Sequence, residues 1–233
     1  MPPSNTALPS SPRGREGNED IYEKIYTAIL EHRLVPGTKL AEERIAEIFK
    51  VSRARIREVL SRLAYERIVE LIPNKGAFIA QPSVEQARDI FEARRVIEPA
   101  IMRRLAAHMT PAAASALREH IAQEVLARQQ DDKRAVIRLS GEFHNLCADL
   151  AGNAALSRSL HELTTLTCLI ILVYDASTAH SCREDQHSMI VEALIDGNET
   201  LASRLMGQHL DHIENSVDFH ESLKEVDLAE IFT

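Results

Sequence analysis

The sequence predicts a mainly α-helical protein in two parts: three short helices with a strand hairpin, followed by an all-helical bundle. Three observations support this. Apolar residues recur at helical spacing through most of the chain, Ala and Leu dominate after residue 90, and a strand-like pattern occurs only around residues 68–80. The chain has 233 residues, of which 45% are hydrophobic and 27% charged, which is enough for two globular domains.

The N-terminal part begins with helices that the apolar spacing places at 19–33, 41–49 and 52–66. Pro36-Gly37 supplies a turn after the first of them. Ser52 can cap the third by accepting a hydrogen bond from a backbone N–H in its first turn. We therefore expect a compact three-helix unit at this end of the chain.

A hairpin is expected directly after the third helix. Ile68–Ile72 is rich in β-branched residues, Pro73–Gly76 is a turn signal, and Ala77–Ala80 has the composition of a second short strand. Three helices followed by such a hairpin make a winged helix-turn-helix. Its wing tip, Asn74–Gly76, would lie along or in the minor groove of DNA.

The third helix has the pattern of a helix that enters a DNA groove. Arg53, Arg55 and Arg57 stand at alternate positions in its first two turns, and an apolar stripe lies behind them (Ile56, Val59, Leu60 and Leu63). Arg53 and Arg57 share a face, whereas Arg55 points elsewhere and can reach a phosphate. The alternative is an ordinary solvated amphipathic helix, which would carry the same stripe.

The charge of the chain is unevenly divided. The net charge is −8, but residues 18–81 carry 11 Lys and Arg against 10 Asp and Glu. Residues 82–233 carry 14 against 24. The acidity therefore does not count against a basic face on the N-terminal part, and only that part is expected to meet nucleic acid.

The cysteines and the chain ends indicate where the protein works. Cys147, Cys168 and Cys182 form no CxxC pair and no disulfide framework, which fits a reducing cytoplasm. Residues 1–17 have the composition of a disordered tail, not of a signal peptide. The apolar run Leu169–Val173 lies in a stretch that we expect to be too short to span a bilayer and that polar residues interrupt, so we interpret it as a buried core helix and expect no membrane partner.

The second part of the chain is predicted to contain only helices. Ser83 begins a long helix that runs to about 108, and Pro111 stands at the first position of the next. The full set of expected helices is 83–108, 111–130, 132–152, 154–174, 181–196 and 198–219. The domain organisation that follows is a tail at 1–17, a DNA-binding domain at 18–81, a helical effector-binding and dimerisation domain at 82–222, and a C-terminal tail at 223–233.

Two sets of motifs carry a resemblance to a known family. The N-terminal set is Pro36-Gly37-x-x-Leu40, Ile45-Ala46, Val51-Ser52-Arg53-x-x-Ile56-Arg57-Glu58-x-Leu60-x-Arg62-Leu63 and Gly76-Ala77-Phe78-Ile79. The C-terminal set is Arg94-Arg95-Val96-Ile97-Glu98-Pro99, Phe143-His144, Gly152-Asn153, His187 and His209. Over roughly residues 19–220 the chain resembles the GntR family of bacterial transcription regulators, in the FadR-like subgroup with an all-helical, FCD-type effector domain.

The resemblance implies a set of DNA-binding residues. In the family, the arginines that match Arg53 and Arg57 contact the operator, and so does a wing-tip residue that matches Lys75 or Gly76. With the neighbouring side chains, the expected DNA-binding residues are Ser52, Arg53, Arg55, Arg57, Arg62, Lys75 and Gly76. The chain departs from the family pattern at Ala54-Arg55, where a proline is missing, and at Arg67, which stands where a glycine usually follows the recognition helix.

The resemblance also implies a metal site in the helical domain. In many members of the subgroup three histidines and an aspartate four residues before the first of them bind a divalent metal. Here His144, His187 and His209 match, and Ser140 takes the place of the aspartate. Three neutral imidazoles suit Zn²⁺ or Ni²⁺ and leave positions open for water or a ligand. The alternative is three ordinary surface or core histidines.

An open coordination position beside Arg94 would suit a small carboxylate, with Ser140 nearby as a further polar contact. Arg94 can instead pair with Glu98 one turn later, and both roles can hold together. The sequence thus predicts a homodimeric transcription regulator, a repressor controlled by an organic acid, which reads a near-palindromic DNA operator. One alternative is a regulator whose helical domain only dimerises. The other is an enzyme, a three-histidine metal hydrolase fused to a DNA-binding domain; we expect that the protein is not an enzyme.

Overall fold

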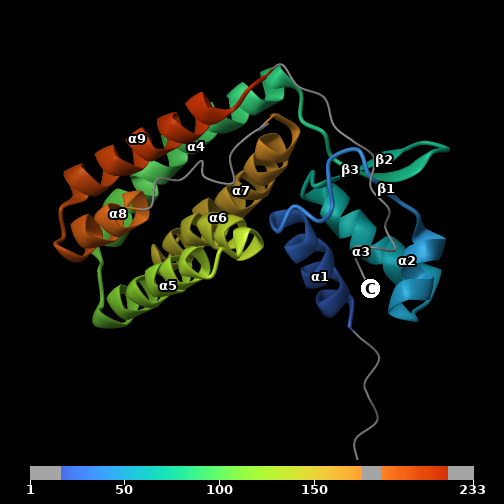
Figure 1. The fold of residues 1–233 in the computed structure, drawn as a ribbon, viewed down its shortest axis with the longest axis horizontal. Helices are drawn as coiled ribbons and strands as arrows, with labels where there is room; N and C mark the ends of the chain where they lie inside the picture. The colour runs from blue at the N-terminus through green and yellow to red at the C-terminus, as the bar shows by residue number, and fades with distance from the viewer. Residues whose placement is uncertain (1–16, 175–184, 220–233) are drawn as a thin grey trace, which may run out of the picture.

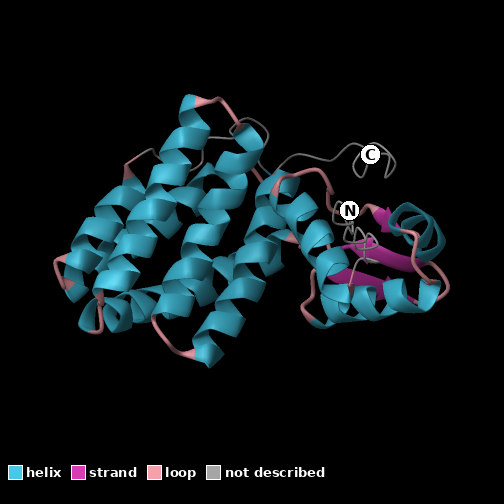
Figure 2. Cartoon of the chain, turned by 90° about the horizontal axis from the view of Figure 1, so that it is seen from below, coloured by secondary structure: helices cyan, strands magenta, loops and turns pink. Residues whose placement is uncertain are grey.

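The computed structural model describes residues 17–174 and 185–219. The N-terminal domain contains helices α1 (Asn18–Leu30), α2 (Glu42–Phe49) and α3 (Arg53–Tyr65). An antiparallel sheet of order β1-β3-β2 joins them, with strands β1 (Lys39–Leu40), β2 (Val69–Ile72) and β3 (Gly76–Ile79). Figure 2 shows this sheet at one end of the molecule, and this arrangement confirms the predicted winged helix-turn-helix.

The helix boundaries follow from local signals in the sequence. Ser52 caps α3 by accepting a hydrogen bond from the backbone N–H of Arg55. Lys50 ends α2 in the left-handed conformation at φ 53°, which makes the tight turn between α2 and α3. The predicted apolar stripe of α3 is buried against α1 and the sheet: Ile56, Val59, Leu60 and Leu63. Strand β1 was not predicted, because two residues are too few to leave an alternating pattern.

The C-terminal part is all-helical in the residues described, as predicted. Its helices are α4 (Val84–Ala107), α5 (Pro111–Gln129), α6 (Lys133–Leu150), α7 (Ala154–Tyr174), α8 (Gln186–Ile195) and α9 (Glu199–Ser216). Ser83, Thr110, Asp132 and Asn198 cap α4, α5, α6 and α9. Figure 1 shows α4 and α9 side by side along one edge, with α5, α6 and α7 beside them.

Helix α7 is long and apolar enough to cross a membrane by length and composition, with a mean hydropathy of 1.3 in its best window. The expectation that this stretch is too short was wrong, because the helix continues without a break over 21 residues. Half of that window is buried inside the structure. Leu166 and Leu169 of α7 even join the core of the N-terminal domain, so the helix packs as the predicted core helix.

The two parts meet where α1 lies against α6 and α7. The hydroxyl of Tyr26 on α1 lies 3.0 Å from Oγ1 of Thr165 and 3.4 Å from Nδ2 of Asn145. Glu31, just after α1, pairs with Arg138 at 3.7 Å. The predicted tails at 1–17 and 223–233 lie outside the described residues, apart from Gly17, which is the N-cap of α1.

Candidate functional site

The start of α3 presents Arg53 and Arg57 to solvent on one face. Their side chains are 58% and 65% exposed. Each pairs with a glutamate from α2: Arg53 with Glu43 at 3.4 Å, and Arg57 with both oxygens of Glu42 at 3.1 and 2.8 Å. The hydrogen bond from Arg57 lowers the pKa of Glu42. Exposed pairs of this kind are weak, so the arginines can leave these partners at little cost.

The other two arginines of α3 are engaged within the domain. Arg55 is half-buried, and its Nε donates to Asn18 of α1 at 2.8 Å. Arg62 lies over the ring of Tyr22, 3.7 Å from its centroid, and pairs with Glu19 at 2.6 Å. These contacts fasten α3 to α1, and they give both arginines a packing role beside the DNA-binding role that the sequence suggested.

The wing tip lies at the turn between β2 and β3. Lys75 and Gly76 are both exposed there, as the sequence predicted. Asn74 and Gly76 have φ angles of 62° and 104°, and only a glycine adopts the second without strain. The tip therefore presents one lysine and a stretch of accessible backbone, which are suited to contact a phosphate or a groove wall.

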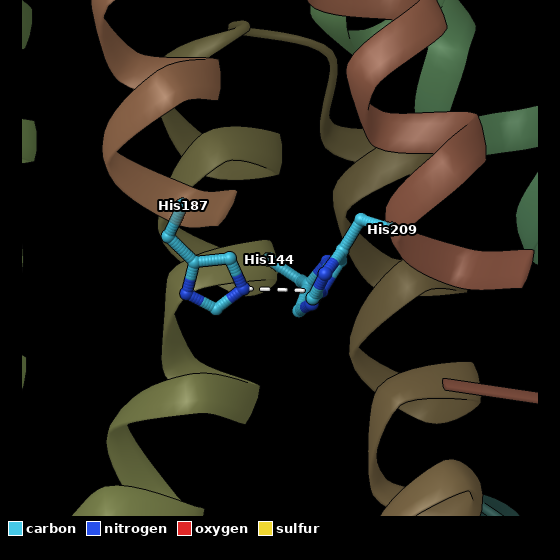
Figure 3. A group of neighbouring side chains, drawn as sticks. All are labelled: His144, His187 and His209. Carbon is cyan, nitrogen blue, oxygen red and sulfur yellow. Dashed lines mark hydrogen bonds between the residues drawn. The ribbon is translucent and has the colours of Figure 1, made fainter. Parts of the chain in front are cut away.

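Three histidines from three helices meet in the interior of the helical domain. His144 of α6, His187 of α8 and His209 of α9 are at most 2% exposed. One ring nitrogen of each lies within 4.8 Å of the other two, and Figure 3 shows the rings gathered around one point. The Nε2 atoms of His187 and His209 are 3.1 Å apart, and those of His209 and His144 are 3.3 Å apart.

Each of these rings is held by an acceptor on its other nitrogen. The acceptors are Glu98 Oε2, 2.6 Å from Nδ1 of His144; Glu124 Oε1 and Oε2, 2.9 and 3.1 Å from Nδ1 of His187; and Gln186 Oε1, 3.0 Å from Nδ1 of His209. Carboxylate and amide oxygens only accept hydrogen bonds, so each Nδ1 carries the ring hydrogen. Each Nε2 is left with a lone pair, and the Nε2 of His209 faces those of His187 and His144.

The spacing of the Nε2 atoms fits a small divalent cation. Lone pairs that face each other at 3.1 and 3.3 Å repel unless a positive charge lies between them. A metal–nitrogen bond of about 2.0–2.1 Å at a tetrahedral angle separates two ligand nitrogens by roughly 3.3 Å. The three rings could therefore hold a metal ion.

The protonation of the rings agrees with this role. Burial lowers the pKa of His144 to about 4, although the charge of Glu98 opposes the shift. Burial and the two neighbouring imidazoles lower the pKa of His209 well below its usual value. Both rings are neutral at physiological pH, which is the form that binds a metal.

The two carboxylates behind the rings stay ionised despite their burial. Burial by itself raises the pKa of Glu98, but the charge of Arg94 leads the opposing effects and the pKa falls to about 2. Burial also raises the pKa of Glu124, and hydrogen bonds from His120 and His187 lower it to about 2. The histidine cluster is thus flanked by two negative charges.

Arg94 reaches the cluster through Glu98, and the structure realises the pair that the sequence offered as one of two roles. Its side chain is 2% exposed, and its Nε donates to Glu98 at 2.6 Å. Its Nη2 is buried without a hydrogen-bond partner among the described residues. Ser140 is half-buried on α6, one turn before His144. A buried guanidinium with a spare donor is a feature that an anionic ligand would satisfy.

Sequence reasoning missed Glu124 and Gln186 and saw Glu98 only as a partner of Arg94. Nothing in the sequence connects Glu124 to His187, because their contact depends on how α5 packs against α8. Glu98 did stand out by its spacing from Arg94, but its second contact with His144 crosses from α4 to α6. Such partners emerge only from the tertiary structure.

Comparison with known protein families agrees with both halves of this description. Residues 18–79 match the family described as bacterial regulatory proteins, gntR family, and residues 89–212 match the FCD domain. The chain belongs to the GntR family, with an FCD domain as its helical part. It is therefore a DNA-binding transcriptional regulator of the GntR/FCD type, as its sequence motifs predicted.

Individual relatives carry regulator names. The chain is 27% identical over 201 residues to the HTH-type transcriptional repressor RspR of Escherichia coli (strain K12), covering 86% of this chain and 88% of RspR. It is 25% identical over 220 residues to the HTH-type transcriptional repressor NanR of Salmonella newport (strain SL254), covering 84% of this chain and 83% of NanR.

Solved structures share the fold across most of the chain. A putative GntR transcriptional regulator from Rhodococcus sp. RHA1 has a TM-score of 0.73 at 24% identity, covering 85% of this chain and 95% of that one. E. coli McbR/YncC has a TM-score of 0.74 at 16% identity, covering 83% of this chain and 93% of its own. These likenesses confirm the two-part architecture.

Proposed function

We propose that this GntR/FCD protein is a repressor whose affinity for its operator is controlled by a small organic acid bound at a metal in the helical domain. The observation that carries the proposal is the convergence of three Nε2 lone pairs, at 3.1 and 3.3 Å, in a fully buried site. The spare donor of Arg94 supports the choice of an anionic effector.

His144, His187 and His209 would hold the metal, with Zn²⁺ or Ni²⁺ as the cations that such a nitrogen set favours. When bound, the metal would supply a Lewis-acidic attachment point for a carboxylate. Arg94 would provide the second anchor through its Nη2, and Ser140 a neutral polar contact. The site thus selects a small carboxylic acid by charge and by hydrogen bonding.

At the other end of the chain, α3 would enter the major groove with Arg53 and Arg57 on base edges and Ser52 near the backbone. Lys75 and Gly76 of the wing would contact the adjacent groove or phosphates. A homodimer would present two such helices, and its two-fold symmetry would match a near-palindromic operator. The protein would work in the cytoplasm, where bacterial DNA is accessible to it.

Helix α6 offers a route between the two functions. His144 points into the histidine cluster, and Asn145, the next residue, contacts Tyr26 of the DNA-binding domain. A ligand that shifts α6 would therefore change how α1 packs against it. Control of the operator requires that the effector prefer one placement of the domains over the other.

The hydrolase alternative is less well supported. A metal-bound water needs a general base on the open side of the metal. Among the described residues, Glu98 and Glu124 contact the Nδ1 atoms of His144 and His187 and so lie behind these rings. A dimerisation-only domain would leave the convergence of the Nε2 lone pairs unexplained.

The test is metal analysis of untagged protein purified without chelator, followed by calorimetric titration with a panel of small carboxylates. We expect about one transition metal per chain, and at least one acid that binds and changes operator affinity in a DNA-binding assay. Protein that stays metal-free after addition of Zn²⁺ and Ni²⁺ would contradict the metal part. Metal-loaded protein that binds no carboxylate would contradict the effector part.

A further inference from the structure

The candidate metal ligands are all neutral, and Glu98 and Glu124 lie one hydrogen bond behind two of the rings. His144, His187 and His209 contribute no charge, and Ser140 places a hydroxyl one turn before His144. A divalent cation in a buried site needs charge compensation, because removal of its hydration shell is costly. When no anionic ligand is bound, this charge has to come from side chains around the rings.

We propose that Glu98 and Glu124, here called the outer carboxylates, are positioning residues that supply this charge through two of the three rings. They fix the imidazoles of His144 and His187 with Nε2 unprotonated, and their charge, passed through the Nδ1 hydrogen bonds, makes the rings stronger donors. This inference rests on the metal binding proposed above. It goes further in assigning the charge balance of the site to residues that touch no metal.

The geometry of Glu98 supports a fixed role in holding the ring of His144. It is fully buried and contacts two partners, Nε of Arg94 at 2.6 Å and Nδ1 of His144 at 2.6 Å. Its two oxygens thus divide between a cation and a ring. Because the same carboxylate also pairs with Arg94, a substitution of Glu98 would not distinguish its role toward the metal from its role in the ion pair.

For Glu124 the role toward the metal is easier to distinguish from a role in an ion pair. It is 4% exposed, and both of its oxygens lie within hydrogen-bond distance of Nδ1 of His187, at 2.9 and 3.1 Å. Its nearest arginine contact is Arg128 at 3.9 Å, and His120 lies 3.4 Å away. The shortest contact of Glu124 is therefore with a candidate metal ligand, not with a permanent cation.

The third ring provides an internal control. His209 has an amide acceptor, Gln186, at 3.0 Å from Nδ1. The amide orients the ring and adds no charge. Substituting Gln186 tests orientation alone, whereas Glu124→Gln keeps one acceptor oxygen for His187, removes the charge and turns the second oxygen into a donor NH2 group.

The experiment measures Zn²⁺ and Ni²⁺ affinity by competition with a chelator, using the full chain. We expect Glu124→Gln to weaken metal binding by about 10- to 100-fold, while Glu124→Asp retains most of the affinity. The double variant Glu124→Gln/Ser140→Asp should regain affinity, because a carboxylate returns on the face of His144. Gln186→Ala should have a smaller effect than Glu124→Gln.

A second measurement concerns the metal-free protein and remains informative if a variant fails to fold. Long-range ¹H–¹⁵N NMR of the wild-type histidines should show the Nδ1–H tautomer for His187 and His144. An Nε2–H tautomer at His187, or a Glu124→Gln protein with unchanged metal affinity, would overturn the inference. Wild-type protein that binds neither metal would instead overturn the proposed function, and the tautomer result would still test the positioning role.

Discussion

The proposed DNA-reading face of α3 and the histidine cluster both hold candidate functional side chains with glutamate partners, but in opposite environments. Glu42 pairs with Arg57 on an exposed face, where the arginine side chain is 65% accessible. Glu98, which holds His144, pairs with Arg94 in the interior, where both side chains are at most 2% exposed. Exposure decides whether such a pair is a temporary arrangement or a fixed part of the fold.

The energies of the two kinds of pair explain the difference. An exposed ion pair contributes at most about 1 kcal/mol, so Arg57 loses little when it leaves Glu42 for DNA. A buried pair that loses one member leaves an uncompensated charge, which costs about 3–5 kcal/mol. One region is therefore built to exchange partners, and the other to keep them.

The strongest test of this contrast removes a buried partner. Glu98→Ala should lower the free energy of unfolding by about 3–5 kcal/mol, because it strands the Arg94 guanidinium in the interior. Urea denaturation measures the loss. The double variant Arg94→Met/Glu98→Leu should recover much of it, and equal stability of Glu98→Ala and wild type would show that the pair is not buried in solution.

The second-largest effect is expected when one candidate metal ligand is removed. His187→Ala should weaken metal binding by more than the roughly 100-fold expected from losing an outer partner. Operator binding without effector should remain, because the substitution lies in the helical domain. Metal analysis and a DNA-binding assay on the same preparation check both statements, and a matched His212→Ala protein, altered one turn from His209, should keep its metal.

On the exposed face, Arg57→Ala should cost about 1–3 kcal/mol of operator affinity, the value of a lost bidentate base contact. Binding to unrelated DNA should change less. Fluorescence anisotropy with operator and scrambled duplexes at one salt concentration measures both. If operator affinity is unchanged, Arg57 does not belong to the reading face.

The smallest effect is expected at the glutamate beside that arginine. Glu42→Gln should change the free energy of unfolding by less than about 1 kcal/mol, because the pair is exposed. It should also raise affinity for unrelated DNA, because a negative charge leaves the binding face. A large loss of stability in thermal denaturation would mean that this pair, like the buried one, is part of the fold.

The same contrast separates what the sequence could predict from what it could not. The apolar stripe of α3 and the cap at Ser52 are local, and the predicted element lay within one residue of the observed helix at each end. The three histidines came together as the resemblance implied, although they lie on α6, α8 and α9. The metal itself stays a prediction.

Partners between helices escaped prediction because they depend on packing. The contact of Arg62 with Tyr22 depends on the angle between α1 and α3. The contact of Glu124 with His187 depends on how α5 packs against α8. A linear pattern shows which face a residue occupies, but it does not show which side chain of another helix it meets.

Arg67, directly after Glu66 at the C-cap of α3, has a consequence for how this protein can vary. It adopts φ 58°, a backbone conformation that disfavours any residue with a Cβ, and its Nε lies 3.6 Å from Glu162 of α7. A glycine there would relieve the backbone and would remove one exposed contact between the N-terminal domain and the helical domain. Because an exposed pair of this kind contributes little, the arginine keeps a strained backbone for a weak contact, and a change to glycine at this position should be tolerated.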